Sequence, residues 1–489
     1  MTSHDSSATG RGIDEKTKEV KFEENDAGNP QNWPRWKKLL SFLPLIPLDL
    51  VVSFGASGYS PATKSFTQTF GVSNEIGVLG LSLYTLALAF GPLVNGPASE
   101  YFGRRPVYIV FYGLAIPFYA GSALAPNVGG FLATRFFCGF FQSVTIAAIG
   151  GTIADLWTHH NTGMPMSIFL WAATAGSSIG FFLLSFVAQY RDYQDVLWTI
   201  MGISGLVYLP VVAATLYCGE TRHSVILRKR AARLRKETGD DTVDVAPEYR
   251  RKSLKQILLV TQSRPFRFLA TEPVVQLGAI YNGYLYGISF LLNGAFNLVF
   301  GPKGHGLSTL QVGLCFLGIA GGITSGPLIN LLQERYYQNR VALAPNPHNL
   351  PEARVMMSKF AAIAHPISLF WFAWTTYKSI NPAVPVLATA LWGWSFYNLI
   401  LMTYQYTEDS YKEYAASALA GLGFIRNLAG AGFPLFGNQM FENEGYQWAG
   451  SILAFLALVM VPIPFVLDRY GERLRRRSPW AAQHMDGVD

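Results

Sequence analysis

Two charged residues stand inside apolar stretches of this sequence, where ionisable side chains are costly. Asp49 lies in one stretch and Arg135 in another, and placing either at the centre of a lipid bilayer costs roughly 2.5–3.5 kcal/mol. Ser53 follows Asp49 one helical turn later, and Gln142 shares a helical face with Arg135. Each helix therefore has a polar face, which predicts that it borders a wet cavity rather than lipid.

An acid beside a guanidinium group is the kind of pair that proton coupling needs. Counted from the ends of their apolar stretches at about 1.5 Å per residue, Asp49 and Arg135 should lie at nearly the same depth. A buried carboxyl group next to a guanidinium group can hold a proton in one state and release it in another, whereas arginine keeps its proton. We therefore predict that Asp49 and Arg135 form the proton-coupling pair. The alternatives are an acid that is paired for structural reasons only, or a span that begins deeper than its apolar window indicates.

A glycine-rich segment with one acid and two arginines separates two long apolar stretches at 91–107. We expect Gly96 and Gly103 to permit a close turn. Glu100 can meet Arg104, Arg105 or the positive N-terminus of a neighbouring helix. The residues Gly-Pro-Leu-Ile-Asn at 326–330 repeat Gly-Pro-Leu-Val-Asn at 91–95, about half a chain later. A half-length repeat with a charged hinge at the same point is typical of duplicated membrane transporters.

The stretch near 268–292 carries polar side chains at helical spacing on an otherwise apolar helix. They are Asn282, Tyr286, Ser289 and Asn293. In lipid such a stripe would be costly, so we predict that it lines a substrate cavity.

Composition indicates a membrane protein. Half of the 489 residues are hydrophobic and 14% are charged, against roughly 25% charged in soluble domains. Twelve windows of about 20 apolar residues fit membrane spans. With both termini inside the cell, 32 of the 38 Lys and Arg residues fall on the cytoplasmic side, as the positive-inside rule requires. The net charge of +7 therefore needs no nucleic acid as a partner.

We predict five segments. They are a disordered cytoplasmic tail (1–38), a six-helix bundle (39–218), a basic cytoplasmic linker (219–267), a second six-helix bundle (268–468) and a cytoplasmic C-terminal tail (469–489). The linker should form a basic amphipathic helix on the membrane surface. The adjacent His159 and His160 lack the helical ligand spacing of a zinc site, so we expect no metal.

The hinge pattern Gly-x-x-x-acid-x-x-Gly-Arg-Arg, with its placement and the half-length repeat, resembles the loop between spans two and three of the major facilitator superfamily. Further motifs sharpen the resemblance to the fungal drug:proton antiporters with twelve spans. These include Asn-Trp-Pro at 32–34, Glu-Thr at 220–221, Thr-Glu-Pro at 271–273, Pro-Glu-Ala-Arg at 351–354 and Pro-Ile-Pro-Phe at 462–465. The resemblance implies an all-α major facilitator fold, with two six-helix pseudo-repeats around a central cavity. It also places Asn398 and Arg426, in spans ten and eleven, beside that cavity.

The resemblance implies a proton-coupled transporter that exports a small organic compound by alternating access. The sequence has no Gly-x-x-x-x-Gly-Lys-Ser/Thr phosphate-binding loop, so ATP is not the expected driver. We expect no cofactor, a lipid bilayer around the chain, small molecules and protons as partners, and function as a monomer. The expected location is the plasma membrane, with an organelle membrane as the alternative.

Two other functions stay open. One is a transporter of an organic anion such as a dicarboxylate, as an exporter or a symporter. Arg135 and Arg426 favour it. Span five favours it too, because antiporters of the superfamily have Gly-Pro-x-x-Gly-Gly there, and this chain has Ser177 and Phe181 in place of the Pro and the last Gly. The other is a membrane enzyme or receptor, for which we find no catalytic constellation.

Overall fold

The computed structural model describes residues 18–158, 161–240, 242–250, 253–343 and 350–482, most of them helical. Within these ranges, twelve helical segments are long and apolar enough to cross a membrane. The predicted fold class and number of spans are confirmed. The segments are Arg35–Phe70, Asn74–Phe102, Arg104–Ala123, Val128–Leu156, Gly163–Tyr190, Tyr193–Cys218, Pro273–Phe300, Thr309–Ala342, Pro351–Trp374, Ala383–Tyr411, Ala415–Glu444 and Tyr446–Arg476.

Several spans consist of more than one helix. Proline lacks an N–H group and favours helix starts, and Pro44 and Pro462 stand at such starts. The first six spans comprise α1 (Arg35–Phe42), α2 (Leu45–Ser57), α3 (Thr63–Phe70), α4 (Asn74–Phe102), α5 (Arg104–Val107), α6 (Gly113–Ala123), α7 (Val128–Gln142), α8 (Val144–Leu156), α9 (Gly163–Tyr190) and α10 (Tyr193–Cys218). The last six comprise α13 (Pro273–Phe300), α14 (Thr309–Ala342), α15 (Met356–Trp374), α16 (Ala383–Tyr411), α17 (Ala415–Glu444), α18 (Tyr446–Met460) and α19 (Pro462–Arg476).

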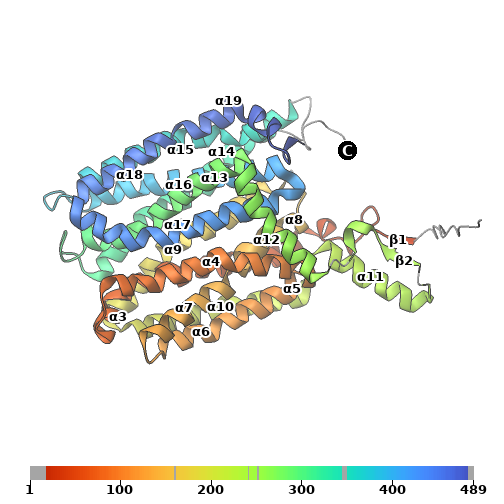
Figure 1. Cartoon of the computed structure of the whole chain (residues 1–489), viewed down its shortest axis with the longest axis horizontal. Helices are drawn as coiled ribbons and strands as arrows, with labels where there is room; N and C mark the ends of the chain where they lie inside the picture. Colours follow the sequence, from red (N-terminus) through yellow and green to blue (C-terminus); the bar gives the residue numbers. More distant parts are fainter. Residues whose placement is uncertain (1–17, 159–160, 241, 251–252, 344–349, 483–489) are drawn as a thin grey trace, which may run out of the picture.

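The two sets of six spans lie side by side with their helices roughly parallel to one long direction (Figure 1). The halves meet where α4 packs against α17 and where α9 packs against α14. α11 (His223–Thr238), β1 (Lys18–Val20) and β2 (Val243–Val245) project from one end of the bundle, and α3 lies at the other end (Figure 1). We call these ends the linker face and the opposite face.

The N-terminal tail departs from the prediction of disorder. β1 pairs with β2 as two parallel strands, in which Lys18 faces Val243. A short 3-10 helix follows at Pro30–Asn32, and α1 begins at Arg35. Pairing with a strand more than 200 residues away has no local signal, which is why the composition suggested disorder. Residues 1–17 of the predicted tail lie outside the described residues, as do His159 and His160.

The basic linker helix also differs from the prediction. The buried Leu227 and Ala231 of α11 pack with Val245 of β2 and with the partly buried Val20 and Phe22. The apolar face of α11 is thus covered by the strand pair rather than by lipid. α12 (Leu254–Thr271) then leads from the linker into α13.

The predicted C-terminal tail begins as a continuation of span twelve. α19 ends at Arg476, and the chain then turns back against the base of the second half. There the Ser478 hydroxyl donates to the carboxylate of Glu272, and Trp480 packs against Phe268. Residues 483–489 lie outside the described part.

Candidate functional site: a closed central cavity and a charged hinge

A small cavity lies where the two halves meet. The residues that line it come from α2, α4, α8, α9, α13 and α17. They are Asp49, Val52, Ser53, Ala56, Leu88, Ile146, Ala173, Tyr286, Phe290, Arg426 and Asn427. Its volume is about 20 Å³, enough for about one water molecule. Small-molecule sites usually measure several hundred cubic ångströms, so this cavity is closed around its polar groups.

Asp49 and Arg426 bring opposite charges to this cavity from opposite halves. Each is 2% exposed. The two charges interact, and Asp49 also has the Thr145 hydroxyl beside it. Arg426 donates to the Tyr404 hydroxyl at 2.7 Å and lies 4.5 Å from the centre of the Tyr286 ring. Asp49 Oδ2 and Arg426 Nε have no hydrogen-bond partner among the described residues. These two groups can therefore still accept or donate a hydrogen bond.

The predicted contact between Asp49 and Arg135 is not formed. Arg135 is fully buried, and its guanidinium group donates to the carbonyl oxygens of Gly80 at 3.0 Å and Gly55 at 2.6 Å. Gly55 stands six residues beyond Asp49 in α2, about 9 Å further along the helix. The depth estimate was wrong because the first helical segment starts before residue 39 and is broken near Leu43. Arg135 instead joins α7 to α2 and α4.

Of the predicted cavity residues, Tyr286 and Arg426 line the cavity and the others do not. Asn282 donates to the Thr403 hydroxyl of α16 at 2.7 Å, and Asn398 donates to the Trp394 carbonyl of its own helix. Gln142 accepts hydrogen bonds from the hydroxyls of Tyr84 and Tyr119 inside the first half. Periodicity identified buried polar faces but did not tell a helix–helix contact from a cavity wall.

The remaining two residues of the stripe in α13 differ from each other. Ser289 is half-buried and does not line the cavity. Asn293 is 2% exposed, and neither amide atom of its side chain has a hydrogen-bond partner among the described residues. Asn293 therefore keeps its full capacity to bind a polar group.

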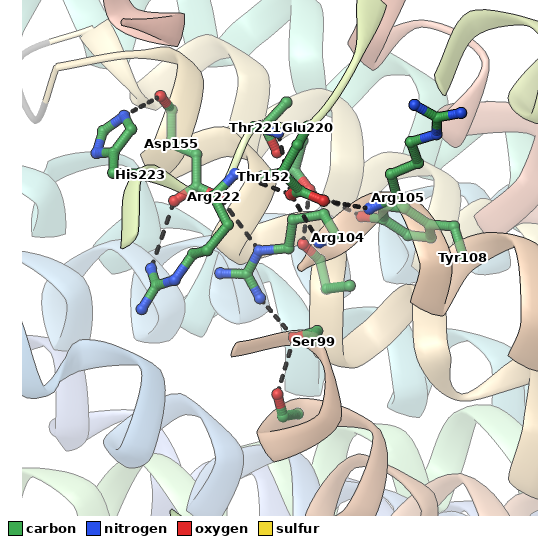
Figure 2. Close-up of polar contacts among 12 residues, drawn as sticks. Ser99, Arg104, Arg105, Tyr108, Thr152, Asp155, Glu220, Thr221, Arg222 and His223 are labelled. Carbon is green, nitrogen blue, oxygen red and sulfur yellow. Dashed lines mark hydrogen bonds and ion pairs between the residues drawn. The ribbon is translucent and has the colours of Figure 1, made fainter. Parts of the chain in front are cut away.

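The hinge at the linker face is built around Arg104 (Figure 2). Its guanidinium group forms an ion pair with Asp155 of α8 at 3.1 Å and donates to Ser99 at 2.5 Å. The backbone N–H groups of Arg104 and Arg105 donate to the Glu220 carboxylate at 2.8 and 3.3 Å. Glu220 also accepts from the N–H groups of Thr221 and Arg222. The N-terminus of α5 thus holds a carboxylate that belongs to the linker.

Asp155 also ties the start of the linker to this hinge. Arg222 approaches its carboxylate at 3.5 Å, and the His223 ring nitrogen Nε2 lies 3.1 Å from its backbone carbonyl oxygen (Figure 2). Burial lowers the pKa of His223, and the nearby Asp155 carboxylate partly opposes that change. Asp155 was missed by sequence reasoning because it stands 51 residues after Arg104, at the end of another span.

Among the hinge residues, Gly103 behaves as predicted, whereas Gly96 and Glu100 do not. Gly103 does form the turn, with φ 102° and ψ 168°, and an added Cβ would lie 2.2 Å from the Glu220 carboxylate. Gly96 lies inside α4, and an added Cβ there would meet nothing within 4 Å. Glu100 influences Arg104 only by its charge. The groups predicted to bind Glu100 bind other acids instead. The Arg104 side chain pairs with Asp155, and the N-terminus of α5 binds Glu220.

The second half contains a matching charge cluster. Arg354, before α15, pairs with Glu334 of α14 at 2.7 Å and with Asp409 of α16 at 2.9 Å. Glu334 also crosses to the first half, where it lies against Gly163 at the start of α9. An added Cβ on Gly163 would be 2.5 Å from its carboxylate. This cluster joins the two halves at the linker face.

Further contacts between the halves close both faces of the bundle. At the linker face, the hydroxyls of Ser167 and Tyr397 are 2.6 Å apart. At the opposite face, Gln189 accepts from the backbone of Leu310 at 3.1 Å, and the rings of Phe181 and Phe316 stack at 3.9 Å. The central cavity is therefore closed at both the linker face and the opposite face.

This architecture of two six-span halves around a closed polar cavity agrees with comparisons to known proteins. A family model described as Major Facilitator Superfamily matches residues 46–434. The chain belongs to the Major Facilitator Superfamily. As a multi-pass member of this superfamily of membrane transporters, it carries small molecules and is not an enzyme.

The curated relatives of this chain include fungal transporters. "Efflux pump FUB11" of Gibberella moniliformis is 34% identical over 98% of this chain and 80% of its own length. The multidrug transporter mdrA of Aspergillus fumigatus is 35% identical over 97% of this chain and 77% of its own. The transporter sorT of Penicillium rubens is 34% identical, with coverages of 96% and 90%.

Solved structures of the superfamily share the fold. The proton:xylose symporter XylE, bound to 6-bromo-6-deoxy-D-glucose, matches with a TM-score of 0.62, at 15% identity over 89% of this chain and 97% of its own. The human organic anion transporter MFSD10 matches with a TM-score of 0.55, at 17% identity over 88% of this chain and all of its own. At such low identity these matches establish the fold alone.

Proposed function

We propose that the protein is a proton-coupled exporter of small organic compounds that works by alternating access. The observation that carries this proposal is that Asp49 and Arg426, from opposite halves, line the same closed cavity at the centre of the bundle. The names of its relatives, an efflux pump and a multidrug transporter, support export as the direction.

Asp49 is the proposed proton carrier. When it is ionised, its attraction to Arg426 holds the halves together at the cavity. Protonation removes that attraction, so the halves separate more easily and Arg426 is free for a substrate. Arg426 cannot give up its own proton, but it keeps the Tyr286 ring and the Tyr404 hydroxyl as partners. A proton on Asp49 and a substrate at Arg426 are thereby linked through one electrostatic interaction across the cavity.

Arg135 has a positioning role in this proposal. Through the Gly55 carbonyl it fixes the part of α2 that follows Asp49, and through Gly80 it ties that helix to α4. Proton coupling therefore still depends on both Asp49 and Arg135. The acid changes its protonation state, and the arginine holds the helix that carries it.

The gate at the linker face consists of contacts between the two halves, and the hinge moves with the first half. Rocking of the two halves has to break the contact between Glu334 and the start of α9, and the hydrogen bond between Ser167 and Tyr397. The Arg104 cluster keeps α4, α5, α8 and the linker moving as one unit. By the positive-inside rule, the linker face is cytoplasmic and both termini lie inside the cell. The plasma membrane is the proposed location, and a monomer holds the complete pathway.

The test uses proteoliposomes with an imposed pH gradient. Asp49→Asn should abolish uphill export while downhill exchange continues, because the amide cannot take up and release the proton. Glu442→Gln is the control, since Glu442 is half exposed and pairs with Lys303 away from the cavity. If Asp49→Asn still concentrates substrate under the gradient, Asp49 is not the coupling acid.

A second candidate substrate class is supported by Arg426. A buried guanidinium group with an unpartnered Nε suits an organic anion such as a dicarboxylate. The same proteoliposome assay distinguishes an organic-anion transporter from an exporter of other small organic compounds. Trans-stimulation by dicarboxylates that disappears in Arg426→Gln favours the anion transporter, and the sign of net flux under the gradient gives the direction.

A further inference from the structure

A second cavity lies at the linker face, away from the central cavity. Its volume is about 640 Å³. Three segments far apart in sequence form its walls: the N-terminal segment, the start of span three and the linker with α11. The lining residues that matter are Trp33, Lys37, Arg105, Val110, Glu220 and Lys229. The proposed function uses none of this space.

The cavity carries an excess of positive charge. Lys37, Arg105 and Lys229 face one acid, Glu220. That carboxylate already accepts hydrogen bonds from the backbone N–H groups of Arg104, Arg105, Thr221 and Arg222. The side chains of Arg105 and Lys229 have no hydrogen-bond or ion-pair partner in the described part of the chain, and the Arg105 side chain points away from the Asp155 cluster (Figure 2). The cavity is therefore built for an anion.

Apolar groups on one side of the cavity make it suitable for an amphiphile. Ile109 and Val110 of span three line it, and Val110 is 53% exposed on the outer surface of the bundle. Trp36 and Tyr217, 56% and 71% exposed, pack together beside Lys37. Exposed Trp and Tyr side chains are typical of the boundary between lipid and water. The cavity thus spans from acyl-chain depth to headgroup depth.

One buried donor lacks a partner at the same place. Trp33 lines the cavity and is 7% exposed, and its Nε1–H group has no acceptor among the residues described. The Lys37 ammonium group lies 3.8 Å from the centre of the Trp33 ring. A buried indole N–H group normally finds an acceptor, and a phosphate or ester oxygen of a ligand would supply one.

We propose that this cavity binds an anionic glycerophospholipid, with its phosphate between Lys37, Arg105 and Lys229 and its acyl chains along Ile109 and Val110. A bound lipid would join the N-terminal segment, the hinge and α11. The proposed orientation places this face at the cytoplasmic leaflet, where anionic lipids attract basic segments. A soluble anion would satisfy the cations but leave the apolar wall uncovered.

The test measures binding of spin-labelled phosphatidylserine to the purified full-length protein in detergent. The double variant Lys37→Gln/Lys229→Gln should weaken binding by about 25-fold, since each lysine near a membrane surface contributes about 1 kcal/mol. Arg105 is left unchanged because it belongs to the hinge. The control Lys236→Gln/Lys378→Gln removes the same charge from two exposed positions outside the cavity and should bind like the unaltered protein.

Competition identifies the ligand. Unlabelled phosphatidylserine should displace the probe, whereas phosphatidylcholine, inorganic phosphate and glycerophosphoserine should not. Equal displacement by inorganic phosphate or glycerophosphoserine would overturn a lipid site, because the acyl chains would then contribute nothing. Equal binding by the two double variants would overturn it as well. Both variants must first elute from gel filtration like the unaltered protein.

Discussion

At the scale of single residues, buried polar side chains of this chain differ in whether they join helices or line the cavity. Asn282 donates to Thr403 of a neighbouring helix, and Gln142 bonds to a ring of tyrosine hydroxyls. Asp49 and Arg426 line the central cavity, and each keeps an atom without a partner among the described residues. The Oδ1 atom of Asn282 also lacks a partner there, but it does not line the cavity. Asn282 and Gln142 therefore stabilise helix packing, whereas Asp49 and Arg426 retain hydrogen-bonding capacity that a substrate or proton can use.

Asn282→Ala should therefore lower stability and leave the substrate profile unchanged. The variant loses the interhelical hydrogen bond to Thr403, which is worth about 1 kcal/mol in a membrane protein. Thermal unfolding in detergent measures the effect, with the half-buried Ser289→Ala in the same helix as control. An altered substrate profile with unchanged stability would place Asn282 in the transport pathway after all.

At the scale of elements, the hinge depends on one backbone conformation. Gly103 has φ 102° and ψ 168°, a region that essentially only glycine adopts, and its Cα faces the Glu220 carboxylate. This turn aims the N–H groups of α5 at the linker. The turn joins α4 directly to span three (Arg104–Ala123), so any shift of the turn moves that span.

Gly103→Ala should destabilise the protein by at least about 1–3 kcal/mol, from the backbone conformation alone, and the clash with Glu220 adds to that. Gly96→Ala is a matched control in the same segment, because its Cβ would be in open space within α4. It should leave stability unchanged or raise it by up to about 1 kcal/mol. The two variants are compared by the midpoint of thermal unfolding and by the yield of folded protein. Equal behaviour of the two variants would mean that the hinge tolerates a side chain.

At the scale of the whole molecule, contacts between the halves decide which face is open. The cavity is shut by contacts at both faces, so opening one face costs the free energy of its contacts. At the linker face, Tyr397 both approaches the Ser167 hydroxyl and donates to the Ser167 carbonyl at 2.9 Å. These bonds link α16 of the second half to α9 of the first half, so they break when the halves separate at this face.

Tyr397→Phe should shift the equilibrium about fivefold toward opening at the linker face, since an interhelical hydrogen bond contributes about 1 kcal/mol. Distances between spin labels on α9 and α16 report that shift. Tyr284→Phe is the control, because its hydroxyl donates to Leu453 within the second half, and its loss should affect stability without favouring either face. Unchanged distances in Tyr397→Phe would mean that other contacts hold the gate.

Composition, basic-residue distribution and the half-length repeat determined the twelve spans, the duplicated architecture and the position of the hinge, because those features follow from local hydropathy and spacing. The partners of the charged residues were decided by tertiary structure alone. Asp49 shares the central cavity with Arg426 rather than with Arg135, and Arg104 pairs with Asp155 rather than with Glu100. A depth along the membrane normal is one coordinate. Which side of a helix faces which neighbour depends on packing across the whole bundle, and the sequence carries no local signal for it.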